Sequence, residues 1–311
     1  MENEGLVVGI DVSKARLDVA LSGSVFPLDN DAAGWAGLLD RLRGKPIQAI
    51  GLEPSGGYER DLVRALRRAG LPVRVLNPRR LRQYARALGA LAKNDRIDAL
   101  MIARYAAELP TRAPRHDPAV EQMAELIVAR RQLSDDKVRL GNQLEQVRDK
   151  ALKRMFTQRL RRIAAEIVLI TRRLAQVVAD NPALAEKDRL IQSFPGAGPG
   201  YSHTLLGLVP EIDDVDRREL AALVGLAPFD DDSGRRHGKR HIAGGRAEVR
   251  NVAYMAALAA TRCNPIMKAH RDRLVASGFA KKAAIIAVAR RMLGIILAML
   301  KTGQPYRQHP A

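Results

Sequence analysis

The chain has 311 residues, 47% of them hydrophobic, which is enough to bury the cores of two or three domains and excludes global disorder. Lysine and arginine total 52 against 34 acidic residues, and the net charge of +18 attracts polyanions, whether nucleic acids or anionic membrane surfaces. The single cysteine, Cys263, excludes an internal disulfide and a multi-cysteine zinc site, and we expect it to be buried as a small hydrophobic residue.

The first 112 residues alternate between strand and helix patterns. Residues 6–13 are apolar almost throughout, which predicts a buried, central strand. Asp29 or Asn30 is expected to cap the first helix. Three consecutive strands followed by alternating helices and strands is the order of an RNase H-like sheet. The expected strands cover residues 6–13, 16–22, 24–29, 46–54 and 71–78, and the expected helices include 32–42, 57–70 and about 94–108.

A proline-rich linker, with Pro110 and Pro114, leads into a region without proline from residue 120 to residue 180. Apolar residues recur there at intervals of seven, and then of three and four, which predicts a coiled coil. Arg130 and Lys137 fall on the other seam position and weaken its first half. The pattern allows one long helix or a hairpin turning near residues 155–158, and an internal hairpin or a dimerisation arm. The seam residues are Leu126, Leu133, Leu140, Val147, Leu160, Ile163, Ile167, Ile170, Leu174 and Val177.

The remaining residues have the pattern of a compact, mostly helical domain with one irregular insert. We therefore expect three domains, covering residues 1–112, 113–185 and 186–311. The longest apolar run, residues 292–300, is short for a membrane span, which needs about 20 residues. The acidic N-terminus does not resemble a signal peptide. We expect a cytoplasmic protein that does not enter a membrane.

Four carboxylates are candidate metal ligands. Asp11 interrupts the apolar first strand, where an ionised side chain is costly unless it is paired or binds a cation, and Glu53 ends the fourth strand. Asp95 and Asp98 are three residues apart and share one face of a helix. Such oxygen donors suit Mg²⁺, and two ions can assist phosphoryl transfer. Taken singly, Asp95 could be a helix N-cap and Asp98 could pair with Arg104.

Two features of the C-terminal half are candidate nucleic-acid contacts. Gly196 and Gly198 precede an apolar helix, as in helix-hairpin-helix motifs, whose backbone N–H groups bind a phosphate, although glycine turns between helices are also common. The irregular insert is basic and rich in glycine, and it could equally be a solvated loop. Its basic side chains are Arg235, Arg236, Lys239, Arg240, Arg246 and Arg250.

The motifs GIDVSK, EPSGGYE and KNDRIDA, with Asn77-Pro78 between the last two, resemble the DEDD transposases of bacterial insertion sequences. This is the IS-one-ten family, which also includes the Piv-type DNA invertases. The resemblance covers nearly the whole chain, and the stretch from His241 is closest to the subgroup typified by IS eleven-eleven. It implies a RuvC-like (RNase H-like) catalytic domain over residues 1–112 that binds Mg²⁺, or Mn²⁺, through Asp11, Glu53, Asp95 and Asp98.

The same resemblance implies a role for Ser233, which lies in a Ser-Gly step between three aspartates and the basic cluster. The family's serine at this step is understood as the nucleophile that joins a DNA 5′-phosphate, and a covalent phosphoserine would allow rejoining without ATP. Ser13 and Ser55 flank the carboxylates but have the positions of structural residues.

The implied partners are double-stranded DNA, both element ends and target, and a bridge (guide) RNA, although the sequence displays no RNA-reading motif. The resemblance also implies a homodimer assembling to a tetramer, with composite sites from two protomers, and a nucleoid-associated protein. Other classes stay open: a site-specific invertase of the Piv type, a RuvC-like junction nuclease that needs the carboxylates but not Ser233, an actin-like kinase or ATPase, and a non-catalytic architectural protein.

Overall fold

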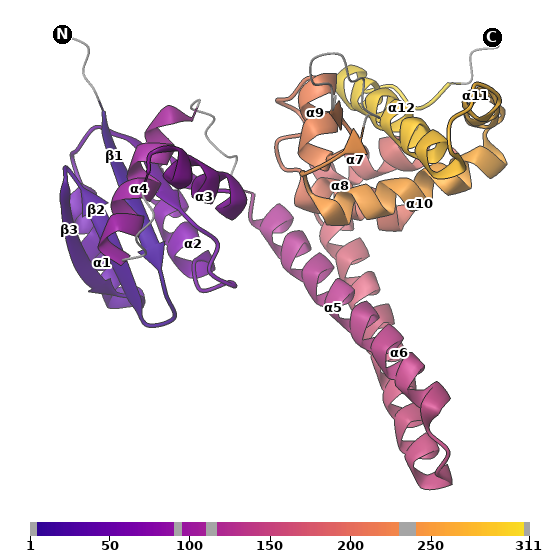
Figure 1. Cartoon of the computed structure of the whole chain (residues 1–311), viewed down its shortest axis with the longest axis horizontal. Coiled ribbons are helices and arrows are strands. Elements are labelled where there is room, and N and C mark those ends of the chain that lie inside the picture. Colours follow the sequence, from indigo (N-terminus) through magenta and orange to yellow (C-terminus); the bar gives the residue numbers. More distant parts are fainter. Residues whose placement is uncertain (1–4, 90–94, 110–116, 230–240, 308–311) are drawn as a thin grey trace. The chain divides into compact units, whose positions relative to one another are not determined.

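A computed structural model describes residues 5–89, 95–109, 117–229 and 241–307, except for the side chains of residues 95–97. The chain divides into two compact units, Met1–His116 and Asp117–Ala311. The N-terminal unit is mixed α/β, and the described part of the C-terminal unit is helical apart from one two-stranded ladder (Figure 1).

The N-terminal unit is built on a five-stranded sheet in the order β3-β2-β1-β4-β5. The apolar first strand is central, as its composition predicts: β1 pairs antiparallel with β2 and parallel with β4. The predicted order of three strands followed by alternating helices and strands is confirmed. The strands are β1 (Leu6–Val12), β2 (Arg16–Leu21), β3 (Ser24–Asp29), β4 (Ile47–Leu52) and β5 (Val73–Val75), and the helices are α1 (Ala32–Leu42), α2 (Arg60–Arg68), α3 (Pro78–Ala87) and α4 (Asp95–Glu108).

Helices cover both faces of this sheet. One face carries the larger apolar cluster, in which residues such as Ile10 and Leu52 pack against the buried leucines of α1 and α2. The other face carries α4, and here the strands present glycine. A Cβ on Gly9 would lie 2.0 Å from the backbone oxygen of Ala99, and one on Gly51 would lie 2.7 Å from Cβ of Ala106. Glycine therefore lets α4 rest directly on the strands.

Arg74 fixes the far end of α4. Its guanidinium donates hydrogen bonds to the carbonyl oxygens of Ala106, at 2.6 Å, and Leu109, at 2.7 Å. Carbonyls in the last turn of a helix have no partner within it, so this arginine acts as a cap from β5. The first helix differs from expectation: Asp31, not Asp29 or Asn30, accepts the capping bond from the backbone of Gly34.

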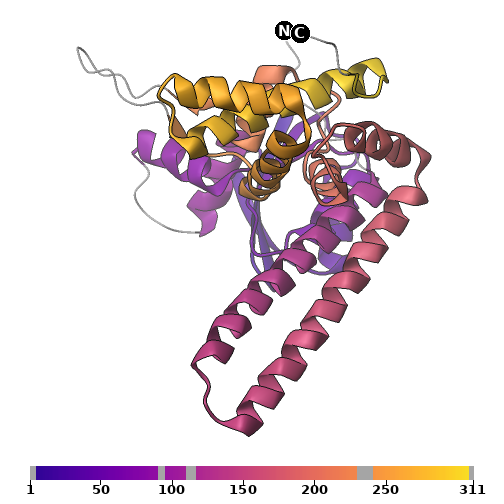
Figure 2. The same cartoon turned by 90° about the vertical axis from the view of Figure 1, so that its right-hand side faces the viewer.

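The predicted coiled-coil region is a helical hairpin. Helices α5 (Pro118–Gln146) and α6 (Lys150–Ala179) pack against each other, and Figure 2 shows them running side by side. The chain reverses over residues 147–149, earlier than the expected turn near 155–158. Every predicted seam residue is buried or half-buried, from Leu126 to Val177. The seven-residue pattern therefore marks the contact between two antiparallel helices of one chain.

The base of the hairpin belongs to the core of the C-terminal unit, where α5 packs on α8 and α6 on α7. The remaining elements are α7 (Pro182–Gln192), α8 (Pro199–Leu208), α9 (Arg217–Val224), β6 (Pro228–Phe229), β7 (His241–Ile242), α10 (Ala247–Cys263), α11 (Pro265–Ala276) and α12 (Lys281–Thr302).

Within the described residues, α12 is the one helix that is long and apolar enough to cross a membrane, a longer segment than the run at residues 292–300 suggests. Half of its most apolar stretch is buried inside the unit, where it packs against α7, α9, α10 and α11. This burial accounts for its composition. The expectation for Cys263 is wrong: the residue is exposed in the last turn of α10, because the buried stripe of that helix passes through Ala253, Ala257 and Ala260.

Candidate active site

Asp11 and Glu53 lie where two neighbouring parallel strands end. The register pairs Ile10 with Leu52, so Asp11 and Glu53 are the next residues on each strand. Gly9 faces α4, and because side chains alternate along a strand, Asp11 faces α4 as well, with Glu53 beside it. Both carboxylates are half-buried. The sheet therefore brings these two predicted ligands to one edge, on one face.

Helix α4 brings its first turn to the same edge. Near the start of β1, Val7 packs against the cluster that contains Ala106, from the last turn of α4. Further along β1, Gly9 lies against Ala99. Helix α4 thus runs antiparallel to β1, and its first turn, which carries the half-buried Asp98, lies beside the carboxyl end of that strand. Asp95 starts α4, and its side chain lies outside the described residues.

The donor set fits a hard cation by its chemistry, because all four predicted ligands are carboxylates. Among the side chains that the structure describes, which exclude that of Asp95, no three His, Cys, Asp or Glu groups are close enough to hold a metal ion together. A cation here would thus need Asp95, or oxygen atoms from a substrate, in addition to the described carboxylates.

A fifth carboxylate, missed in the sequence, lies on this face. Asp18 of β2 is directly opposite Asp11 in the antiparallel ladder and is 8% exposed. Arg16 donates a hydrogen bond of 2.6 Å to its carboxylate. The signal available in the sequence was the alternation in RLDVAL, which places Asp18 on the face opposite to Leu17 and Val19.

Two loops at this edge are joined by Asn30. Its side-chain nitrogen donates to the carbonyl of Ser13, at 2.8 Å, and to that of Tyr58, at 3.1 Å. Its side-chain oxygen accepts from the indole N–H of Trp35 at 2.9 Å. The turn after β1 and the loop after β4 are thereby tied to each other and to α1, which fixes the spacing of the segments that carry Asp11 and Glu53.

The loop after β4 has its own anchor in Glu59, which is 8% exposed. One carboxylate oxygen accepts from the backbone of Ser55, at 2.9 Å, from that of Gly57, at 2.9 Å, and from the Ser55 hydroxyl, at 3.2 Å. Burial acts to raise the pKa of Glu59, but the hydrogen bonds outweigh it and hold the pKa below its usual value. Glu59 is therefore a buried structural carboxylate of this loop.

The segment that contains Ser233 lies outside the described residues, together with Arg235, Arg236, Lys239 and Arg240. The residues that flank it on either side are in contact with each other. Strands β6 and β7 pair antiparallel at the base, and the backbone of Gly225 meets that of Gly245 so closely that a Cβ on Gly245 would lie 2.2 Å from the Gly225 nitrogen. Glycine is required at this contact.

Arg246 and Arg250, the other two predicted nucleic-acid contacts, both form bonds beside the β6–β7 ladder. Arg246 forms an ion pair of 2.6 Å with Glu211. Arg250 donates to the carbonyl oxygen of Gly244. Both guanidinium groups are engaged within the unit, so the structure gives each arginine a positioning role that the charge pattern did not indicate.

The glycine turn precedes α8 as predicted. Gly198 is exposed and is the N-cap of that helix. Gly196 has a positive φ of 102°, and a Cβ on it would lie 2.6 Å from the backbone of Ala260 in α10. Gly196 therefore allows close packing of the turn against α10, and Gly198 is the residue that leaves a helix start open to solvent.

A buried polar group lies on α8. His203 is 4% exposed, with its Nε2 3.6 Å from the carboxylate of Asp188, which accepts a hydrogen bond from Ser202. Its Nδ1 finds no hydrogen-bond partner among the described residues. Burial lowers the pKa of His203, Asp188 acts in the opposite direction, and Arg130 adds to the lowering. The net direction is down, which favours a neutral imidazole.

Comparison with known proteins identifies the family. A family model for the DEDD transposases of IS110, described as Transposase, matches residues 8–156, and the model described as Transposase IS116/IS110/IS902 family matches residues 188–271. The chain is 27% identical over 242 residues to the Pilin gene-inverting protein of Moraxella bovis, covering 75% of this chain and 74% of the relative. It is 27% identical over 263 residues to the Pilin gene-inverting protein of Moraxella lacunata, covering 82% and 80%.

Relatives from insertion elements match a shorter part. The Insertion element IS900 uncharacterized 42 kDa protein of Mycobacterium paratuberculosis is 35% identical over 128 residues, covering 39% of this chain and 31% of the relative. The motifs, the two family matches and these relatives agree, and the chain belongs to the IS110 (IS-one-ten) family of transposases, whose members are enzymes that act on DNA.

Proposed function

We propose that this protein is the transposase of an insertion sequence, which cuts and rejoins DNA strands with a carboxylate-bound divalent metal and a serine nucleophile. The observation that supports it most directly is the β1–β4 register. It sets Asp11 and Glu53 side by side at the strand ends, facing the first turn of α4. The strand order β3-β2-β1-β4-β5 and the helix across the sheet support the RuvC-like, RNase H-like domain of this proposal.

The metal ligands of this proposal are Asp11, Glu53, Asp95 and Asp98, and the ion is Mg²⁺, with Mn²⁺ as a substitute. Such an ion, when bound, polarises a phosphate and offsets the negative charge that develops on its oxygens. The chain itself holds the carboxylates in place: Asn30 and Glu59 fix the loops that follow Asp11 and Glu53, and the glycine contact holds α4 against the sheet.

In the proposed strand cleavage, the Ser233 oxygen attacks a DNA phosphorus atom. A bond forms between that oxygen and phosphorus, the bond to the 3′ oxygen breaks, and the serine proton passes to this 3′ oxygen, which leaves as a hydroxyl. The resulting 5′-phosphoserine keeps the energy of the phosphodiester, so a second 3′ hydroxyl can displace the serine and rejoin the strand without ATP. Ser13 and Ser55, the two serines beside the carboxylates, are less suited as nucleophiles, because their hydroxyls donate hydrogen bonds within their own turns.

The partners in this proposal are double-stranded DNA at the element ends and the target, and a bridge RNA that selects them. DNA contact is assigned to the basic segment with Ser233 and to the α8 start at Gly198. Composite sites in a homodimer that assembles to a tetramer would bring a carboxylate site and a serine from different protomers to one phosphate. The division into a catalytic domain, a coiled-coil region and a C-terminal domain belongs to the same proposal, as do the cytoplasmic location at the nucleoid and the IS eleven-eleven subgroup.

A second candidate is a site-specific DNA invertase. The matches to the two Moraxella pilin gene-inverting proteins support it, since each covers about three quarters or more of both chains. An invertase would recombine two fixed sites without a guide RNA. A junction nuclease, the third candidate, would use the carboxylates and hydrolyse DNA without Ser233.

One experiment separates these three candidates. The protein is purified from its host with bound nucleic acid, the RNA is sequenced, and recombination is assayed with the recovered RNA and Mg²⁺. A transposase requires the RNA, joins strands, and loses joining in Ser233→Ala, whereas Ser13→Ala and Ser55→Ala, the matched controls, retain it. Joining without RNA supports the invertase, and cleavage that persists in Ser233→Ala supports the nuclease and overturns the proposal.

A further inference from the structure

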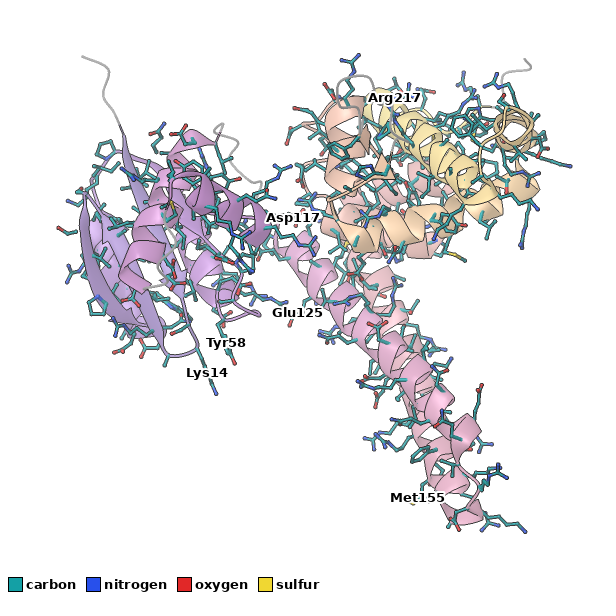
Figure 3. The ribbon with its side chains drawn as sticks, viewed as in Figure 1. Lys14, Tyr58, Asp117, Glu125, Met155 and Arg217 are labelled. Atoms are coloured by element: carbon teal, nitrogen blue, oxygen red, sulfur yellow. The ribbon has the colours of Figure 1, made fainter. Side chains whose placement is uncertain are left out.

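An exposed aromatic side chain stands at the carboxylate edge of the N-terminal unit. Tyr58 is 49% exposed, five residues after Glu53, and Lys14 is exposed three residues after Asp11. The side-chain amide of Asn30 donates to the carbonyl of Ser13, which precedes Lys14, and to the carbonyl of Tyr58, so the two turns are adjacent. Figure 3 shows the Lys14 and Tyr58 side chains projecting from the same edge of this unit.

The exposure of Tyr58 is imposed by the loop. The two preceding residues, Gly56 and Gly57, have positive φ values of 75° and 111°, so the chain turns sharply before it. The following residue, Glu59, is buried and bonded to the backbone of the same turn. The Tyr58 carbonyl is itself bonded to Asn30. Because these contacts fix the backbone on both sides of Tyr58, its ring stays exposed to solvent, although burial would stabilise an aromatic side chain.

The charge around the ring suits a nucleic acid strand. Lys14 and Arg60 are exposed at the ends of the same loops, and Arg16, which pairs with Asp18, is exposed as well, whereas Asp11 and Glu53 are half-buried. Aromatic faces bind nucleic acids by stacking on a base, with nearby cations on the phosphates. In an intact duplex both faces of each base are already stacked, so an isolated ring at this place fits an unpaired base.

We infer that Tyr58 stacks on an unpaired base of the strand that enters the carboxylate site, with Lys14 on the adjoining phosphate. The ligand is a single-stranded segment of DNA, such as a strand opened next to the phosphate that is cut. The inference rests on the proposed function for the position of that phosphate, and it is independent of the serine nucleophile. It adds a substrate-binding residue outside the four carboxylates.

The test uses the full-length protein and a single-stranded oligonucleotide that contains 2-aminopurine, whose fluorescence is quenched when it stacks. The wild type is expected to bind with quenching. Tyr58→Ala should bind about 5- to 150-fold more weakly, because stacking contributes about 1–3 kcal/mol per base. Tyr58→Phe should keep both affinity and quenching, since it retains the ring. Lys14→Gln should reduce the salt dependence of binding by about one phosphate contact.

Phe279→Ala is the matched control, because Phe279 is 50% exposed and lies in the other unit. Unchanged binding in Tyr58→Ala, or equal losses in Tyr58→Ala and Phe279→Ala, would overturn the inference. An equal loss in Tyr58→Phe and Tyr58→Ala would also overturn it, since the hydroxyl and not the ring would then make the contact.

The outcome is separable from that of the proposed function. If the wild type quenches but does not recombine DNA, the proposed function fails and the stacking site stands. If the wild type recombines DNA and Tyr58→Ala binds and quenches normally, the stacking inference fails alone.

Discussion

Asp18 lies directly opposite Asp11 across the β1–β2 ladder, so two carboxylates face the same side of the sheet at neighbouring positions. Like charges placed opposite each other on adjacent strands destabilise the pair. Arg16, bonded to Asp18 at 2.6 Å, offsets part of this repulsion within the chain. In the proposed function, a divalent cation bound at this edge would reduce the repulsion further.

Arg16→Gln should therefore lower the stability of the metal-free protein and increase the stabilisation on adding metal. The loss of the ion pair is expected to cost about 1 kcal/mol, because Asp18 is nearly buried while the arginine is partly solvated. Thermal unfolding with and without Mn²⁺ measures both effects. Arg43→Gln is the control, since the Arg43–Asp40 pair is exposed on both sides. Equal metal responses in the two variants would argue against a cation near Asp18.

Gly9→Ala should displace α4 and weaken metal binding. Its Cβ would lie 2.0 Å from the Ala99 oxygen, and such overpacking costs about 1–3 kcal/mol or more. Gly51→Ala makes a milder contact and should have a smaller effect. Gly37→Ala, in the open part of α1, should instead stabilise the unit by about 0.5–1 kcal/mol. Titration with Mn²⁺ checks this order, and full metal affinity in a folded Gly9→Ala would refute the placement of α4.

The base of the Ser233 segment should tolerate alanine at Gly244 better than at Gly245. Both residues have a positive φ, 66° and 64°, so each substitution carries about 1–2 kcal/mol of backbone strain. Only the Gly245 side chain would also collide with Gly225. We expect Gly245→Ala to lower the Tm further and to reduce strand joining at least tenfold more. Matching values for the two variants would show that the close contact does not position this segment.

The C-terminal unit should lose stability as the pH falls from about 7 to 5. The folded protein holds the pKa of His203 below its usual value through burial and the charge of Arg130, against the opposing pull of Asp188. The unfolded chain therefore binds a proton in this range that the folded chain resists, so unfolding is favoured at lower pH. His203→Gln cannot take up that proton, and its unfolding midpoint in urea should vary less between pH 7 and 5. An unchanged pH slope would place the titrating group elsewhere.

The order of elements in the N-terminal unit was predictable from the sequence because strands and helices differ in the period of their apolar residues. The central position of β1 followed from its continuous apolar character. The hairpin is not predictable in this way, because a repeat of seven residues fits one long helix and two packed helices equally well. The two helices separate at residues 147–149, where Asp149 caps α6 and no proline or glycine marks the turn in the sequence.

The candidate site was only partly predictable, for a different reason. Asp11, Glu53 and Asp98 are visible as charges in apolar or motif contexts, but Asp18 in RLDVAL has the alternation of an ordinary half-exposed strand. Asn30 was interpreted as a helix cap, whereas its side chain links loops 17 and 28 residues away. The basic cluster predicts nucleic-acid contacts for Arg246 and Arg250, but it does not indicate their hydrogen bonds to Glu211 and Gly244. Contacts between segments distant in the sequence determine all these roles, and local pattern does not encode them.

In the proposed reaction DNA is held on Ser233 during recombination, and the carboxylates are required for the step. It is tested by mass spectrometry of the protein after reaction with element-end DNA, the recovered RNA and Mg²⁺, followed by nuclease and protease digestion. We expect a nucleotide attached to the peptide that contains Ser233, with no adduct in Ser233→Ala or Asp11→Asn. An adduct on another residue, or one that persists in Ser233→Ala, would contradict it.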